Sequence, residues 1–153
     1  EGAQFEQPKN IDLVEFIKYK TNDYNMLASK KSITIKFSSN VSSFQIIIQE
    51  TLFNQILQNF VQNAIKFTPN GKTIKIKLKK IDDKVILNVI DEGIGIDENI
   101  DVFAPFKKVG KENGVGLGLY LAKIASDALN AKISIKNRED GKTGAIAKLE
   151  LTL

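Results

Sequence analysis

The amino-acid sequence predicts an α+β fold, a two-layer α/β sandwich in which helices cover one face of a mixed β-sheet. Apolar residues recur with the helical period of 3.6 in three segments, at about 11–28, 50–67 and 115–130. Between and after these segments, short apolar runs and alternating patterns predict strands. The resulting order, α-ββ-α-ββ-loop-α-ββ, is typical of helices packed on one side of a sheet.

The length of 153 residues suits one domain, and the composition excludes several kinds of site. The chain has no cysteine and no histidine, which excludes disulfides, thiolate metal sites and every Ser-His or Cys-His catalytic arrangement. The net charge of +4 fits an anionic ligand, but it also fits plain solubility. No apolar run is long enough to span a membrane, and no signal peptide opens the chain. Any chemistry would therefore rest on carboxylates, amides, lysines, backbone groups and a hard cation.

The first part of the chain has the weaker local patterns. Residues 1–10 are polar, and we expect a tail or linker stub from a preceding domain, with the domain itself at 11–153. Asn10 is expected to cap the first helix. Two short β-like runs, 32–37 and 44–49, follow this helix.

The second helix and the elements after it have clearer boundaries. The helix over 50–67 is expected to stop at Thr68-Pro69-Asn70-Gly71. Strands are expected at 73–80 and 84–91, joined by a hairpin at Asp82-Asp83. The chain would end, after the third helix, with a hairpin whose strands are 132–137 and 145–153.

One face of the helix over 50–67 carries amides and a lysine. Asn59, Asn63 and Lys66 fall within a narrow wedge, with Gln55 and Gln62 beside them. Solvated helix faces usually mix glutamate with lysine, and asparagine is a mediocre helix former. Two asparagines four residues apart, just before a lysine, indicate hard-oxygen ligation of a cation beside a phosphate. A solvated face is the alternative interpretation.

Two glycine motifs flank the irregular segment. Asp91-Glu92-Gly93-Ile94-Gly95-Ile96 follows an apolar strand, so its carboxylate could bind a flat ligand lying against bare backbone. A tight turn is the alternative. Gly114-Val115-Gly116-Leu117-Gly118-Leu119 opens the third helix, where free N–H groups suit a phosphate. This second motif is weak alone, because its G-x-G-x-G spacing does not match the dinucleotide fingerprint.

Together these motifs resemble those of the sensor histidine kinases. Asn59–Lys66, within NQILQNFVQNAIKFTPNG, resembles the N box, and DEGIGI at 91–96 resembles the first glycine box. Phe103-Ala104-Pro105-Phe106 is similar to the F box, and GVGLGL at 114–119 is similar to the second glycine box. The order matches as well, over about residues 11–153. The resemblance implies the catalytic ATP-binding domain with the Bergerat fold of the GHKL superfamily, which gyrase-type and mismatch-repair ATPases share.

The resemblance also implies a role for each motif residue. Asn63 would coordinate Mg²⁺, Asn59 would support the metal and phosphates, and Lys66 would pair with a phosphate, so these three would be catalytic. Asp91 would accept a hydrogen bond from the adenine amino group of ATP. The other nucleotide contacts would come from the glycine boxes and from a lid over 97–113: Gly93, Gly95, Ile96, Phe103, Phe106, Lys108, Gly114, Gly116, Leu117, Gly118 and Leu119.

Departures from the family pattern bear on the reaction. The ATP-hydrolysing relatives carry a glutamate base where Asn59 stands, and an amide cannot accept a proton at neutral pH. Phosphoryl transfer needs positioning and charge neutralisation more than a strong base, so Asn59 favours transfer over hydrolysis. Lys108 stands where the family often has arginine, and Gly144-Ala145 stands where it often has Gly-Thr.

The leading expectation is a kinase domain of a two-component system. It would bind ATP and Mg²⁺ and phosphorylate a histidine on a dimerising helical hairpin of the same or a partner chain, with a response regulator downstream. The alternatives are a nucleotide-sensing interaction module and a Bergerat ATPase coupled to conformational change. Lysines such as Lys75, Lys77 and Lys79 fit the solvated face of a strand, so no nucleic-acid partner is expected. We also expect a cytoplasmic monomer without membrane contact of its own, whatever anchors the parent protein.

Overall fold

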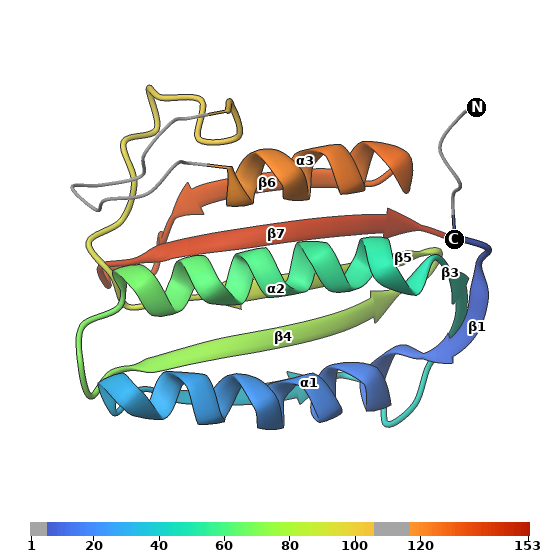
Figure 1. Ribbon diagram of the computed structural model, residues 1–153, viewed down its shortest axis with the longest axis horizontal. Helices are drawn as coiled ribbons and strands as arrows, with labels where there is room; N and C mark the ends of the chain where they lie inside the picture. Colours follow the sequence, from blue (N-terminus) through green and yellow to red (C-terminus); the bar gives the residue numbers. More distant parts are fainter. Residues whose placement is uncertain (1–5, 106–116) are drawn as a thin grey trace.

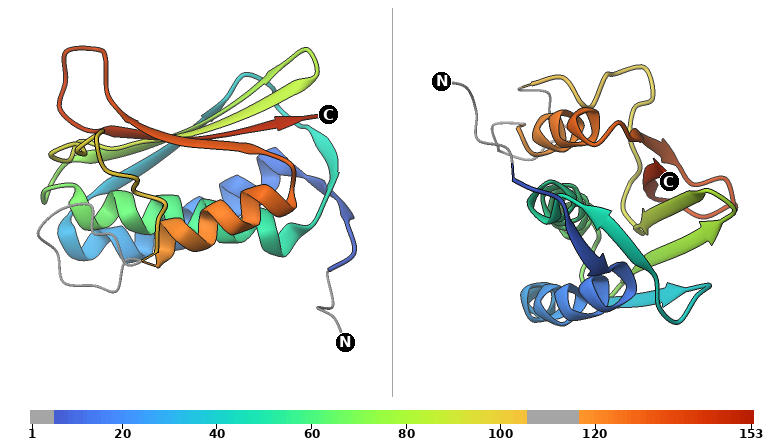
Figure 2. Two further views of the ribbon diagram at one scale, coloured as in Figure 1. Left: turned by 90° about the horizontal axis from the view of Figure 1, so that it is seen from above. Right: turned by 90° about the vertical axis from the view of Figure 1, so that its right-hand side faces the viewer.

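The computed structural model describes residues 6–105 and 117–153. The described residues form three α-helices that lie on one face of a five-stranded sheet (Figures 1 and 2). The elements are β1 (Lys9–Asp12), α1 (Leu13–Ala28), the short 3₁₀ turn η1 (Ser29–Lys31), β2 (Thr34–Ser39), β3 (Gln45–Ile48), α2 (Glu50–Phe67), β4 (Thr73–Ile81), β5 (Lys84–Ile90), α3 (Gly118–Ala128), β6 (Lys132–Asn137) and β7 (Ala145–Thr152). The predicted two-layer α+β sandwich is confirmed.

The large sheet is mixed, with the strand order β2-β4-β5-β7-β6. β2 runs parallel to β4, and the other neighbours are antiparallel. Side chains alternate along β4, β5 and β7, so that one set is buried under the helices and the other is more exposed. The predicted hairpins are confirmed, because β4 pairs with β5 and β6 pairs with β7.

The core lies between the helices and this sheet, and α2 is its central helix. Phe53 and Phe60 are almost completely buried, as are the inward-facing Ile74, Ile76 and Leu87 of the sheet. α2 spans the predicted 50–67, and the amide of Thr68 closes its last turn on the carbonyl of Ala64. None of the described helices has the length and apolarity needed to cross a membrane.

The start of the domain differs from the expectation. Lys9–Asp12 forms β1, which pairs with β3, so Asn10 lies opposite Ile47 in a strand and does not cap the helix. The cap is Asp12, whose carboxylate accepts hydrogen bonds from the amides of Val14 and Glu15. The expected Asn10 cap is therefore wrong: Asp12 does the capping instead, because the strand pairing carries the extended backbone two residues further.

Other boundaries moved by a few residues. The runs expected at 32–37 and 44–49 are strands at Thr34–Ser39 and Gln45–Ile48. In the described part of the chain the third helix begins at Gly118 and ends at Ala128, two residues before the expected end.

Candidate functional site

Asp91 stands directly after β5, at the end of a central strand of the sheet. Its exposed fraction is 7%, and its amide still pairs with the carbonyl of Ala145 at the start of β7. One carboxylate oxygen, Oδ1, accepts hydrogen bonds of 2.9 Å from the amides of Gly93 and Ala145. The other, Oδ2, makes no hydrogen bond to the described residues. The result is a fixed, buried carboxylate with one acceptor oxygen uncommitted.

The electrostatics of Asp91 follow from this position. Burial raises the pKa of its carboxyl, because desolvation disfavours the charged form. The two amide donors and the nearby guanidinium of Arg138 act in the opposite direction. Desolvation thus raises the pKa of the Asp91 carboxyl, whereas the amides of Gly93 and Ala145 and the guanidinium of Arg138 lower it.

The two glycines after Asp91 allow close approaches. A methyl group on Gly93 would lie 2.6 Å from the carbonyl oxygen of Phe67, at the end of α2. Gly95 has a φ of +85°, and a methyl group there would lie 2.5 Å from Oδ1 of Asn137. Both glycines are therefore required by the fold itself, and they bring the 91–96 segment against α2 and β6.

Two residues that sequence reasoning missed hold this segment. The side-chain amide of Asn137 pairs with both main-chain groups of Ile96: Oδ1 accepts from its N–H at 2.7 Å, and Nδ2 donates to its carbonyl at 2.9 Å. Arg138 donates from Nη1 to the carbonyl of Asp91 at 3.0 Å. No local pattern marks these residues, since their partners lie more than 40 positions away along the chain.

The amide face of α2 lies beside the start of α3. The side chains of Asn59 and Asn63 are half-buried, and neither makes a hydrogen bond to the described residues. A methyl group on Gly118 would lie 3.2 Å from Oδ1 of Asn59, so the first turn of α3 faces that amide. Lys66 is exposed, with Nζ 5.5 Å from the ring centre of Phe67.

These amides fit a hard cation by their chemistry. No cluster of three or more histidine, cysteine or acidic side chains suited to a metal occurs among the described residues. A cation at this face would therefore take amide oxygens from the protein and complete its shell with water and ligand oxygens. That donor set suits Mg²⁺, which usually keeps several waters and is bound with substrate phosphates.

The remaining predicted site residues fall into two groups. Ile96 is half-buried, Phe103 packs against the core, Leu117 precedes the first turn of α3, and Leu119 is buried. The second group, Phe106, Lys108, Gly114 and Gly116, lies outside the described residues together with residues 106–113 of the expected lid.

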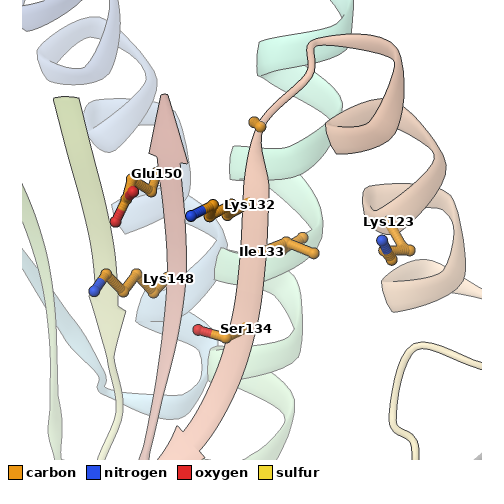
Figure 3. Close-up of a pocket in the computed structure, with 7 residues that line it drawn as sticks. Lys123, Lys132, Ile133, Ser134, Lys148 and Glu150 are labelled. Atoms are coloured by element: carbon orange, nitrogen blue, oxygen red, sulfur yellow. The ribbon is translucent and has the colours of Figure 1, made fainter. Parts of the chain in front are cut away.

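A hollow of about 470 Å³ lies elsewhere, along β6, β7 and α3 (Figure 3). Figure 3 shows Lys132, Lys148 and Glu150 on one side of β6, whereas Ile133 and Lys123 lie on the other. Glu150 is already paired with Lys84, and Lys123 with Asp127. The side chains that line this hollow do not converge, and none of the predicted site residues lines it.

The fold is a two-layer α/β sandwich with its candidate site beside the end of β5, and comparison with known proteins gives its family. The profile of the histidine kinase-, DNA gyrase B- and HSP90-like ATPases matches residues 48–153, and the chain belongs to this family. Its relatives within the family include sensor histidine kinases. The sensor protein KdpD of Clostridium acetobutylicum is 34% identical over 152 residues, which is 94% of this chain and 16% of KdpD.

Solved structures agree with the sequence comparison. The catalytic domain of the histidine kinase ThkA has a TM-score of 0.85 at 26% identity, and the match covers 95% of both chains. Full-length ShkA in complex with AMPPNP has a TM-score of 0.85 at 25% identity, over 98% of this chain and 32% of ShkA. The chain thus spans most of the ThkA catalytic domain but only 16% of KdpD and 32% of full-length ShkA.

Proposed function

We propose that this domain binds ATP with Mg²⁺ and donates the γ-phosphoryl group to a histidine on a helical hairpin outside the chain. The observation that carries the proposal is Oδ2 of Asp91, an uncommitted acceptor at the end of a buried strand. The amino group of adenine can donate a hydrogen bond to such an oxygen. Guanine or hypoxanthine would present a carbonyl oxygen there, and two acceptors would face each other without a proton.

The glycine contacts support the same placement of the base. Gly93 and Gly95 lie beside Asp91 and carry no side chain, so a flat ring could approach the main chain. Ile96 would contact the base or ribose from the far end of the segment. The AMPPNP complex of ShkA gives independent support, because that related structure holds an ATP analogue.

The phosphates would lie toward α2 and the start of α3. Gly118 lets the first turn of α3 approach the amide of Asn59, and Asn63 lies one turn further along α2. Mg²⁺ held by Asn63 would neutralise charge on the phosphate oxygens, which is the largest need of phosphoryl transfer. Asn59 would hold a metal-bound water or a phosphate oxygen, and Lys66 would pair with phosphate from the next turn. Leu117, Gly118 and Leu119 would present N–H groups, while Phe103 would anchor the lid to the core.

The residues favour transfer over hydrolysis. In the transfer step, a nitrogen of the acceptor imidazole bonds to the γ-phosphorus, the bond to the bridging oxygen breaks, and ADP leaves. The imidazole brings its own lone pair, so no base is needed on α2, where Asn59 stands. ThkA has been solved in complex with the response regulator TrrA, at a TM-score of 0.80 and 28% identity to this chain over 95% of its length. We propose a downstream regulator of the same kind for the parent of this domain.

The test is calorimetric titration of the domain with ATP and Mg²⁺, repeated with inosine triphosphate and with Asp91→Asn. Inosine triphosphate shares the triphosphate and differs at the 6-position of the purine. In the variant, the new Nδ2 group would face the adenine amino group, donor against donor. We expect the domain to bind inosine triphosphate at least about tenfold more weakly than ATP, and Asp91→Asn to bind ATP at least about tenfold more weakly than the wild type does. A tenfold difference corresponds to about 1.4 kcal/mol. Equal binding of both nucleotides, or of ATP by both proteins, would refute the base site.

A second measurement separates the kinase from the alternatives. Incubation with γ-labelled ATP and a supplied histidine-containing hairpin should move the label to the hairpin. Label that stays on ATP would indicate a nucleotide-sensing module, and release of inorganic phosphate by this chain alone would indicate an ATPase.

A further inference from the structure

The last residue of β6 and the residue after it hold both ends of the Asp91–Ile96 segment. This segment leaves the sheet after Asp91, and its hydrogen bonds to the rest of the described chain come mainly from side chains. Asn137 binds its last residue, Ile96, and Arg138 binds its first, Asp91. We call Asn137 and Arg138 the β6 clamp.

Asn137 is matched to its contact in shape and in hydrogen-bonding pattern. Its amide offers one acceptor and one donor to the N–H and carbonyl of Ile96, as a neighbouring strand would. Its own main-chain N–H donates to Oε2 of Glu98 at 2.7 Å, which fixes the chain just beyond the segment. A carboxylate at position 137 could accept from Ile96 but could not donate, and it would stand near the carboxylate of Glu98.

Arg138 is fixed on its other side by an ion pair. Its Nε and Nη2 donate to the two oxygens of Asp140 at 3.2 and 2.7 Å, while Nη1 reaches the carbonyl of Asp91. The side chain is only 8% exposed, and the pairing holds the pKa of the Asp140 carboxyl at about 2. The main-chain N–H of Arg138 also donates to the carbonyl of Gly144, next to the strand residue that binds Asp91 Oδ1.

We infer that Asn137 and Arg138 are positioning residues that set the discrimination between adenine and 6-oxopurines. This inference rests on the proposed nucleotide site and assigns a role to residues that would not touch the nucleotide themselves. Asp91 Oδ2 can read the 6-substituent only when the carboxylate is held in one orientation, and Gly95–Ile96 must be held where the ring would lie. Arg138 fixes the main chain of Asp91, from which the carboxylate extends to the amides of Gly93 and Ala145, and Asn137 fixes the main chain of Ile96.

The experiment compares four variants in the domain as it stands. Asn137→Asp keeps the shape and removes the donor to Ile96, and Arg138→Gln removes the guanidinium. Lys136→Gln and Glu139→Gln are the controls, because these two exposed residues flank the clamp and their side chains make no hydrogen bond or ion pair to the described residues. Affinities for Mg-ATP and Mg-inosine triphosphate are measured by calorimetry at pH 8, well below the melting temperature of each variant.

We expect each clamp variant to lower ATP affinity by about tenfold and inosine triphosphate affinity by less than about twofold. The ratio of the two affinities should therefore shrink about tenfold, while both controls keep the wild-type ratio. A merely structural residue would lower the folded fraction and leave this ratio unchanged. An unchanged ratio in both clamp variants, with a wild-type domain that does discriminate, would overturn the inference alone. A wild-type domain that binds neither nucleotide, or both equally, would instead overturn the proposed function.

Hydrogen exchange of the free domain tests the clamp contact without nucleotide, in case a clamp variant does not fold well enough for calorimetry. The amide of Ile96 is bound by Asn137, so its hydrogen exchange reports the clamp directly. The shorter variant Asn137→Ser cannot span both groups of Ile96, and it should expose this amide to exchange while leaving that of Leu87 in the sheet protected. Equal protection of Ile96 in wild type and Asn137→Ser would count against the clamp.

Discussion

The two ends of the candidate site are built in different ways. At the base end, Asp91 is buried, and its main-chain groups and one carboxylate oxygen bond to Gly93, Ala145 and Arg138. At the phosphate end, Asn59 and Asn63 are half-buried amides without hydrogen bonds to the described residues. The base end is thus set by the same contacts that hold the sheet, whereas the phosphate end leaves its donors and acceptors available.

This difference predicts how each end responds to change. Contacts at the base end contribute to folding, so substitutions there should cost both stability and nucleotide affinity. The amides of α2 contribute little to folding beyond their helical backbone, so their loss should cost affinity alone. A rigid base site beside a less constrained phosphate site suits phosphoryl transfer, because phosphates and hydrated cations must reorganise during the reaction.

The largest expected effect is on stability, from Gly144→Ala at the base end. Gly144 has a φ of +141°, and a methyl group there would lie 2.1 Å from the carbonyl oxygen of Asp91 and 2.9 Å from Cδ of Arg138. Steric overlap and backbone strain together should lower the free energy of unfolding by about 3 kcal/mol or more.

The matched control is Gly141→Ala in the same connection. Gly141 also has a positive φ, +81°, but a methyl group there would meet nothing within 4 Å. It should cost about 1 kcal/mol, from the left-handed conformation alone. Urea denaturation of both variants measures the two costs, and similar values would show that the base end is not tightly built.

The next effect is on affinity, from Asn63→Ala at the phosphate end. Removing the proposed metal ligand should weaken Mg-ATP binding by at least about tenfold, as expected for the loss of about 1.4 kcal/mol. The free energy of unfolding without ligand should change by less than about 0.5 kcal/mol, since the side chain of Asn63 makes no hydrogen bond to the described residues. Calorimetry and urea denaturation give the two numbers.

Gln62→Ala is the control for this prediction, because Gln62 is an exposed amide one residue earlier on α2. It should change neither quantity. A large loss of stability in Asn63→Ala, or equal affinities in the two variants, would contradict the division between the two ends.

Much of the fold could be predicted because its elements carry local patterns. α2 has a complete apolar stripe and ends at a proline-asparagine-glycine stop, and its predicted bounds are those observed. The strand β6 was also predicted with the bounds that the structure shows, 132–137. β1 was not, because a four-residue polar strand becomes a strand only by pairing with β3, which lies more than 30 residues later.

Local patterns marked some positions of the candidate site and missed others. Motifs made of residues close together in the sequence, such as Asp91 with Gly93 and Gly95, could be recognised from the sequence and assigned to the end of a strand. The approach of Gly118 to Asn59 is marked by no local pattern, because it depends on how α3 packs beside α2. Asn137 and Arg138 could not be found, because each acts on main-chain atoms of a segment brought near by the sheet and has no spacing of its own.

The smallest effect is a dependence on pH that sets the two ends apart. Burial raises the pKa of Asp91 in the folded protein, so its ionised form costs stability above that pKa. As pH falls through the raised pKa, protonation removes this cost, and the contribution of Asp91 to stability improves. Nucleotide affinity should move the other way, because protonated Oδ2 is no longer a free acceptor for the adenine amino group.

The ratio of the affinities for ATP and inosine triphosphate separates the protonation of Asp91 from that of the phosphates, because both nucleotides carry the same triphosphate. At the pKa of Asp91 the affinity for ATP should have fallen about twofold, because half of the carboxyl groups are then protonated. Inosine triphosphate should gain in comparison, since a protonated carboxyl can donate to its 6-oxo group. The ratio should therefore begin to fall at a higher pH than the titration of an ordinary aspartate would produce. A ratio that stays constant down to the ordinary range of aspartate would mean that Asp91 does not read the base in its ionised form.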